Sequence, residues 1–256
     1  MRKRKKVFLR IFLWASLCVL TLPVYGKCGI ILKKQSSRLI PGRGKTQVLQ
    51  TWLEYYQDNK VAVYQRNAIF ITDIGSNTLI NILPTRRIYA VNSVDDFVQR
   101  IEKIVQQIKA QKLFGEKKAP QAPLKVQIKE TGKSKKILGY PSQEAEIYVN
   151  GKKVEVMWYT ERLPLKDEID VEKAREKKTK IESIFEELSG EKDFEQSKEY
   201  QNFMKGQKVP LLTITYNMGT EEIERVVDIK ITSIPQRIFQ VPEGYKKVPI
   251  EQFMRH

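Results

Sequence analysis

The stretch GYPSQEAEIYVNGKKVEVMWYT, residues 139–160, decides the fold. Apolar and polar residues alternate on both sides of Asn150-Gly151, a pair that favours a two-residue type I′ turn between antiparallel strands. The stretch therefore predicts a hairpin at the centre of a sheet, with Trp158 continuing its apolar face. The turn fixes the expected partners, which are Val149 with Lys152, Ile147 with Val154, Ala145 with Val156 and, as a mildly unfavourable pair, Glu146 with Glu155.

Short β-favouring segments flank this hairpin and are separated by turn residues such as DN, GSN and PTR. Such regular, short spacing is typical of an antiparallel meander. The expected strands are 48–56, 60–66, 68–74, 78–83, 87–91, 124–131, 211–218 and 222–234.

Two helical regions interrupt the strands. Ser93 is a favourable helix cap, and an apolar stripe that starts at Phe97 and Ile101 predicts a helix after it. Residues 167–206 are rich in charge at helical spacing and predict a charged helical insertion. Charged helices usually just face water, so this insertion is expected to pack by one edge, and the alternative is an arm that binds an envelope protein partner.

The first 26 residues have the pattern of a signal peptide. A basic head at residues 1–6 precedes an apolar run at 7–22, and small residues at 24 and 26 suit cleavage. The alternative is an uncleaved anchor in the inner membrane, although the run is shorter than the roughly 20 residues of a membrane span. Both interpretations place the rest of the chain outside the cytoplasm, as a periplasmic or outer-envelope protein.

The remaining chain reads as one domain with a short lead-in. Residues 27–45 are polar and basic and predict a flexible leader, followed by a single domain at 46–256. Cys28 is the only cysteine after the signal peptide, so no intramolecular disulfide is expected, and lipidation of Cys28 stays open.

Composition excludes several classes of function. Residues 1–26 hold six of the 46 Lys and Arg residues and none of the 30 Asp and Glu residues, which leaves a net charge of +10. Lysine and glutamate are intermixed without interleaved aromatics, so no nucleic acid is expected, and a weak contact with an anionic membrane surface stays open. His256 is the only histidine and the last residue, so no metal, cofactor or Ser-His-Asp triad is expected.

The order of strands, helix, strands, helical insertion and closing strands resembles the lipoprotein-carrier-like family, the LolA/LolB-type half-barrel, and especially a branch of small exported bacterial proteins. The segments INILPTRRIYAV (80–91), ILGYPSQEAEIYVNGKKVEVMWYTERLP (137–164) and VPEGYKKV (241–248) carry the resemblance, which covers roughly residues 46–250. It implies an α+β fold in which a curved antiparallel sheet wraps around helices and leaves an apolar groove. The charged segment 167–206 departs from the family pattern.

Such a groove predicts an exported, non-catalytic protein that binds a hydrophobic or lipid-like ligand, for example the acyl chains of a lipid or lipoprotein. Residues of this kind are also typical of an ordinary core. The candidate ligand-binding residues are Trp52, Phe70, Ile82, Val156 and Trp158.

Two other functions stay open. An envelope scaffold or regulatory module would have a fully packed core and would bind a protein through residues 167–206. An enzyme would need convergent carboxylates in a deep cleft. Glu144, Glu146 and Glu155 are expected on the outer face of the hairpin, where glutamates usually serve solubility.

Overall fold

Twelve strands form one continuous sheet in the computed structural model of the chain, which describes residues 28–39, 46–112, 124–189, 193–217 and 219–253. Their order is β12-β6-β5-β4-β3-β2-β1-β11-β10-β9-β8-β7. All neighbours are antiparallel except β12 and β6, and the end strands β12 and β7 do not pair with each other. The strands are β1 (Cys28–Leu39), β2 (Thr46–Gln57), β3 (Lys60–Tyr64), β4 (Ile69–Asp73), β5 (Thr78–Leu83), β6 (Ile88–Ser93), β7 (Val126–Ile137), β8 (Tyr140–Val149), β9 (Lys152–Thr160), β10 (Val209–Asn217), β11 (Thr220–Ser233) and β12 (Lys246–Lys247).

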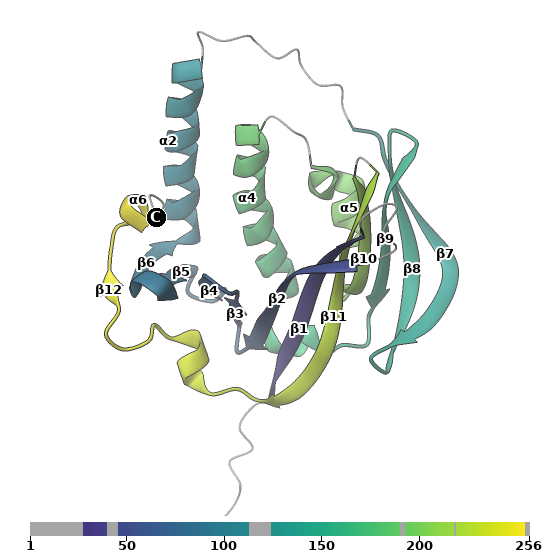
Figure 1. Cartoon of the computed structure of the whole chain (residues 1–256), viewed down its shortest axis with the longest axis horizontal. Helices are drawn as coiled ribbons and strands as arrows, with labels where there is room; N and C mark the ends of the chain where they lie inside the picture. The colour runs from purple at the N-terminus through teal and green to yellow at the C-terminus, as the bar shows by residue number, and fades with distance from the viewer. Residues whose placement is uncertain (1–27, 40–45, 113–123, 190–192, 218, 254–256) are drawn as a thin grey trace, which may run out of the picture.

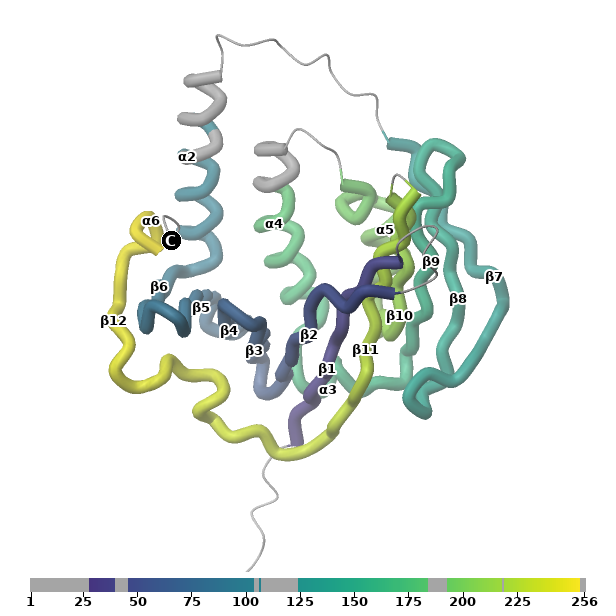
Figure 2. The backbone as a smooth tube through the Cα atoms, in the orientation of Figure 1, coloured from purple at the N-terminus to yellow at the C-terminus, as the bar shows by residue number. Residues whose placement is uncertain are grey.

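The sheet curves around its helices, and the three longest α-helices, α2, α4 and α5, lie on its concave side (Figures 1 and 2). The predicted α+β class with a curved sheet is therefore confirmed, but the sheet is mixed, because β12 and β6 are parallel. The α-helices are α2 (Val94–Lys112), α3 (Leu165–Glu168), α4 (Val171–Ser189), α5 (Lys198–Phe203) and α6 (Ile250–Phe253), and the 3₁₀ turns are η2 (Pro84–Arg86), η3 (Phe194–Gln196) and η4 (Gln236–Phe239).

The first helix begins where the sequence predicts. The Ser93 hydroxyl oxygen accepts a hydrogen bond of 2.9 Å from the backbone N–H of Asp96, which satisfies one free donor of the first turn of α2. Asp95 and Asp96 lie in that turn, where a negative charge is favourable, and Ile101 is buried.

The predicted hairpin turn is present, but the pairing register changes after the second residue pair beyond the turn. Asn150 and Gly151 both have positive φ, and Val149 pairs with Lys152 as expected. A β-bulge then shifts the pairing, so that Ile147 lies opposite Glu155 rather than Val154, and Ala145 lies opposite Met157. A one-residue slip exchanges the two faces of a strand. Beyond the bulge, Glu155 turns toward the core side of the sheet, and the expected pairs of Ile147 with Val154, Ala145 with Val156 and Glu146 with Glu155 are wrong.

The predicted flexible leader is also wrong over most of its length. Residues 28–39 form β1, which pairs with β2 on one side and β11 on the other. Ile30 and Leu32 on this strand are buried, and the side chain of Lys34, in the polar run that follows them, is partly buried. The sheet thus begins at Cys28 rather than at residue 46, while residues 40–45 lie outside the described residues, as do 1–27 with the expected signal peptide and 254–256 with His256.

The described residues of the charged segment 167–206 form α4, η3 and α5, as a helical insertion that follows β9 and precedes β10 in the chain. Its helices lie on the concave side of the sheet (Figure 1). Val171 and Ala174 on α4 pack against the core formed by β1, β10 and β11. Tyr200 and Phe203 on α5 pack against β8 and β9. The second half of this insertion is less helical than expected, because it consists of the 3₁₀ turn η3 and the six-residue α5.

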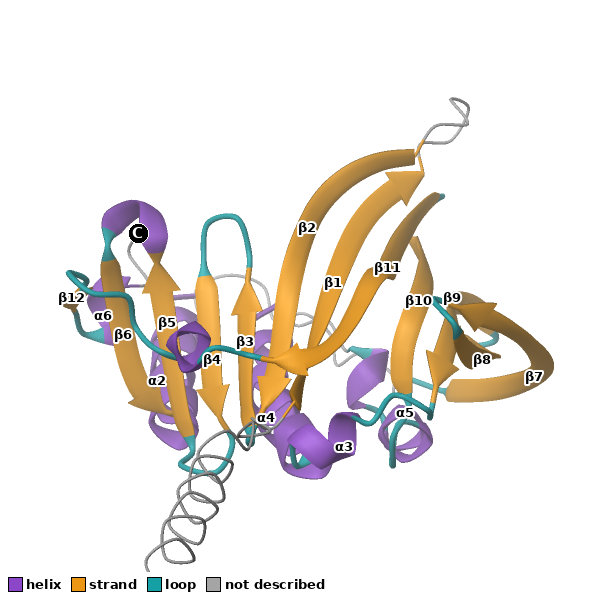
Figure 3. Ribbon diagram, turned by 90° about the horizontal axis from the view of Figure 1, so that it is seen from below, coloured by secondary structure: helices purple, strands orange, loops and turns teal. Residues whose placement is uncertain are grey.

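The chain end covers the opposite, convex side of β3, β4 and β5, as Figure 3 shows from below. Ile234 and Phe239 pack there against Ile71 and Ile82. The Tyr64 hydroxyl donates a hydrogen bond of 2.9 Å to the backbone carbonyl of Ile238 and fixes this covering segment to β3. This half of the sheet therefore has protein on both faces.

Candidate functional site

A cavity of about 720 Å³ lies between the concave face of the sheet and helices α4 and α5. Strands β1, β2, β3, β4, β9, β10 and β11 supply one wall, and the helical elements α2, α3, α4, η3 and α5 supply the other. This volume is within the range of about 300–1,000 Å³ that is usual for small-molecule sites.

One end of the cavity is apolar. Val61 and Val63 on β3, Leu165 and Ile169 around α3, and Val171 on α4 line it. Most of them belong to the core cluster that also contains Ile30 and Leu32 of β1, or pack against it. This end provides a surface on which a hydrocarbon group could be buried.

The other end is polar, because each bordering element changes character along its length. The same face of β1 continues from buried Leu32 to Lys34. The first turns of α4 carry Val171 and Ala174 toward the core, and the next turn brings Lys178 to the cavity. The cavity is therefore amphipathic along its axis.

Lys34 holds two carboxylates at the polar end. Its Nζ lies 3.2 Å from Oε1 of Glu54 and 3.3 Å from Oε1 of Glu224. Burial opposes the charge on Lys34, but these two carboxylates outweigh it and raise its pKa above the usual value. Trp52 Nε1 also donates to Glu54 at 2.9 Å, and the Tyr56 hydroxyl donates to its other oxygen.

Glu54 stays ionised in this setting. Burial alone would raise its pKa, but the charge of Lys34 and the hydrogen bonds from Tyr56 and Trp52 lower it below the usual value. A lysine and a glutamate that hold each other charged in a partly buried site form a fixed electrostatic group rather than a proton-transfer pair.

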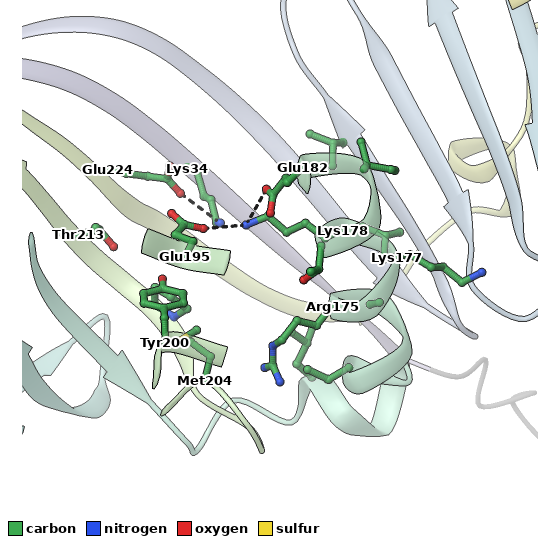
Figure 4. Close-up of a pocket in the computed structure, with 18 of the residues that line it drawn as sticks. Lys34, Arg175, Lys177, Lys178, Glu182, Glu195, Tyr200, Met204, Thr213 and Glu224 are labelled. Atoms are coloured by element: carbon green, nitrogen blue, oxygen red, sulfur yellow. Dashed lines mark hydrogen bonds and ion pairs between the residues drawn. The ribbon is translucent and has the colours of Figure 1, made fainter. Parts of the chain in front are cut away.

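Lys178 holds a second pair of carboxylates across the cavity from the sheet. Its Nζ lies 3.2 Å from Glu182 on the same helix and 3.4 Å from Glu195 on η3. Figure 4 shows this arrangement, with Lys34 and Glu224 on the sheet facing Lys178, Glu182 and Glu195 on the helical side. Gln196 Nε2 donates a hydrogen bond of 3.0 Å to Oε2 of Glu182.

Glu155 on β9 differs from these carboxylates because no lysine or arginine among the described residues forms an ion pair with it. It is only 3% exposed and it lines the cavity. The Thr215 hydroxyl donates a long hydrogen bond of 3.5 Å to its Oε2, while its Oε1 has no hydrogen-bond partner among the described residues. Burial, followed by the negative charge of Glu195, raises the pKa of Glu155 to about 8, so this carboxyl is mostly protonated at neutral pH.

None of the five residues predicted to bind ligand belongs to the cavity lining. Ile82 is fully buried against the covering segment on the convex side. Val156 and Trp158 alternate with Glu155 and Met157 along β9, so they lie on the face away from the cavity, where Lys135 Nζ is 3.8 Å from the centre of the Trp158 ring.

The other two lie closer to the cavity. Trp52 reaches its polar end through the hydrogen bond to Glu54. Phe70 is opposite Val63, which does line the cavity, but Phe70 itself is outside the lining. The structure thus brings these five side chains to four separate places.

Sequence reasoning missed the charged residues that do line the cavity. Lys34 was assigned to the leader, because two lysines in a row after the apolar run of GIILKK show no alternation that would turn one of them inward. Glu155 was expected on the outer face, and only the bulge reverses it. Its neighbours Glu144 and Glu146 do lie on the far side, where Lys133 and Lys153 bind them.

Within the described residues, no group of three or more His, Cys, Asp or Glu side chains is arranged to hold a metal ion. No helix in the described part of the chain is both long enough and apolar enough to cross a bilayer. The chemistry available at the site is thus that of lysine and carboxyl groups beside an apolar surface.

No family model matches the chain, and no curated protein shows a significant match to it. Two solved structures of PNGF-II, in the P21 and C2 space groups, match with TM-scores of 0.41 and 0.39 at 11% and 13% identity. The matches cover 89% of this chain and 33% and 32% of the PNGF-II chains, so the chain spans about a third of the length of these proteins. Likenesses at this level carry no argument about the fold or the activity of this chain.

Proposed function

We propose that this chain is an exported, non-catalytic protein that binds an amphiphilic, lipid-like ligand in the cavity between the curved sheet and α4–α5. The observation that carries the proposal is the cavity itself, which is about 720 Å³ and apolar at one end and charged at the other. Each methylene buried at the apolar end would contribute about 0.8 kcal/mol. A short acyl or alkyl chain would thus supply most of the binding free energy, and the polar end would orient it.

The half-barrel family and the cleaved export signal stay predictions from the sequence. A fully packed scaffold is the alternative, in which α4 binds another envelope protein through its exposed side, for example Glu176 and Lys180. The open cavity favours the binding protein, because a scaffold has no use for an unfilled space behind its helices.

Catalysis is the other alternative, since Glu155 and Glu195 converge on one cavity from different elements. Glu195, however, is held by Lys178, just as Glu224 is held by Lys34. A carboxylate fixed in an ion pair is poorly placed to exchange a proton with a substrate. We therefore propose binding without turnover.

Native mass spectrometry of the chain purified from its own envelope, followed by identification of the released ligand, tests the proposal. We expect an added mass of a lipid-like molecule, and we expect the purified chain to bind the neutral fluorescent probe Nile red and to release it when a lipid-like molecule is added. A bare protein mass and no probe binding would favour the scaffold, whereas conversion of the bound molecule to a product would indicate an enzyme.

A cavity-filling variant locates the binding. Thr213→Trp places a large ring in the cavity on β10, and we expect at least about a tenfold loss of probe affinity. Ile231→Trp is the matched control, because Ile231 lies on neighbouring β11 and is 50% exposed, away from the cavity. Equal affinities of the two folded variants would show that the probe binds elsewhere.

A further inference from the structure

Glu155 is a buried carboxylate in the cavity wall, and one of its oxygens has no hydrogen-bond donor among the described residues. A buried carboxyl oxygen without a donor costs free energy, so buried polar groups are nearly always satisfied by protein, water or ligand. Oε1 of Glu155 has no such donor in the described residues, although the side chain is 97% buried by the protein and borders an open cavity. The missing partner would therefore have to come from the cavity side.

The charged groups around Glu155 are mostly negative. Glu195 and Asp193 face it from the η3 segment, and Glu224 faces it from β11. Tyr200 on α5 adds a buried hydroxyl, and Thr215 on β10 adds a weak donor. None of these groups is a cation.

The two lysines at the polar end of the cavity already have carboxylate partners. Lys34 serves Glu54 and Glu224, and Lys178 serves Glu182 and Glu195, so two ammonium groups face four carboxylates before Glu155 is counted. The other cations of the lining, Arg175 and Lys177, have partners of their own in Glu172 and Asn77. The polar end thus lacks positive charge where Glu155 lies.

We infer that the ligand of this cavity carries a cationic, hydrogen-bond-donating head group, a primary or secondary ammonium on a lipid-like chain, which donates to the free oxygen of Glu155. The inference rests on the proposed function and names the ligand class of that site. The ammonium supplies the donor that Oε1 lacks and a third positive charge for the carboxylate cluster, while the alkyl chain lies along Val61, Leu165 and Ile169. An anionic head group, such as that of a fatty acid, would meet Glu195 and Glu224 without a free cation.

A proton exchange accompanies this binding. The empty site holds Glu155 protonated at neutral pH, since its pKa is raised to about 8, and an ammonium beside the carboxyl favours the ionised form. Binding of an alkylammonium at pH 7 therefore releases a proton to the buffer. Its affinity rises with pH up to about pH 8 and then levels off, because above that pH the carboxylate no longer has to lose a proton.

The experiment compares four ligands of equal chain length by displacement of Nile red below their micellar concentrations: dodecylammonium, dodecyltrimethylammonium, dodecanol and dodecanoate. Dodecylammonium has both charge and donor, and we expect it to bind at least about tenfold more tightly than dodecanol and dodecanoate, with the trimethyl compound between them. Titration calorimetry in buffers of different ionisation enthalpy measures the released proton in the unmodified protein and needs no variant.

Two variants assign the effect to one residue. Glu155→Gln keeps the shape and removes the charge, so we expect the preference for dodecylammonium over dodecanol to disappear and the proton release with it. Glu144→Gln is the matched control, because Glu144 is equally buried on the same sheet but faces Lys133 and Thr131 away from the cavity. The control should keep both properties.

The outcomes separate the two proposals. Equal affinity for all four ligands, or tighter binding of dodecanoate, with no proton release, would overturn the ammonium head group while leaving a lipid-like ligand in place. No displacement by any of the four ligands would count against the proposed function as well. A preference for dodecylammonium that persists unchanged in Glu155→Gln would assign the cation to another residue and would also overturn the inference.

Discussion

Substitution of Glu155 by glutamine should make the empty protein more stable at neutral pH. Glu155 has a pKa of about 8 in the folded state against 4.5 for an ordinary glutamate. Between these two values the unfolded chain has lost the proton and the folded chain still holds it. Stability therefore falls as pH rises through this window, by at most about 1.4 kcal/mol per pH unit.

The magnitude at a given pH follows from that slope. At pH 7 the buried carboxyl costs the folded state up to about 3 kcal/mol relative to a neutral side chain of the same shape, and near pH 4.5 the cost vanishes. Above about pH 8 both states are ionised and the cost stays constant. Glu155→Gln should thus equal the original protein in stability at pH 4.5 and exceed it by a growing margin up to pH 8.

Urea unfolding followed by tryptophan fluorescence at half-unit steps from pH 4.5 to 9 measures this difference directly. Subtracting the two free energies of unfolding cancels the titration of groups that the substitution does not touch. A difference that does not change with pH would show that Glu155 titrates normally, and the burial imposed by the bulge would then be refuted. Glu144→Gln should be less stable than the original protein at pH 7, because it loses the ion pair with Lys133.

Two further substitutions test the central strand β1. Lys34→Met leaves buried Glu54 without its cation and should lower the free energy of unfolding by about 2 kcal/mol at pH 7. This loss should shrink below pH 4.5, because the carboxyl of Glu54 is then protonated. Lys33→Met, on the exposed face of the strand, should have almost no effect. Equal effects of the two lysines in chemical denaturation would contradict the inward orientation of Lys34. Gly29→Ala adds a Cβ at 2.5 Å from Cδ1 of Ile234. It should lower the free energy of unfolding by about 1–3 kcal/mol and the melting temperature by several degrees. Gly75→Ala, whose nearest atom is 3.4 Å away, should change the melting temperature little. A normal melting temperature for Gly29→Ala would count against the tight seam between β1 and the start of the covering segment.

Local signals in the sequence were sufficient for much of the fold. The Asn150-Gly151 turn, the Ser93 cap and the short strands of the meander each depend on neighbouring residues, and all are present. The pairing of β1 with β11 joins residues that are about 190 positions apart, as in the contact of Lys34 with Glu224. No pattern within residues 28–39 indicates a strand partner so far away in the sequence, so the polar residues after Leu32 were interpreted as a leader.

The candidate site was harder to predict for a related reason. Alternation correctly indicates that neighbouring residues of β9 face opposite sides, but it does not show where a bulge shifts the register. A shift of one residue between Ile147 and Tyr148 was enough to exchange the faces, which sent Val156 and Trp158 outward and Glu155 inward. The apolar residues Val156 and Trp158 of β9 therefore lie on the face away from the cavity, and the charged Glu155 lies on the face that lines it.

The buried carboxyl and the open cavity have a common explanation under the proposed function. A fold that only needed to be stable would place an apolar side chain at position 155, since Ile147 and Met157 surround it and a neutral residue would avoid the cost of ionisation. A cationic ligand removes that cost when it binds, because it supplies charge and donor to the group that lacks both. Ligand binding should therefore stabilise the protein most at about pH 8 and above, where the empty site is least stable. Melting curves with dodecylammonium at pH 5 and pH 8 compare the two conditions: a larger shift at pH 8 supports the link, and a shift that is the same or smaller at pH 8 separates the cavity from the carboxyl.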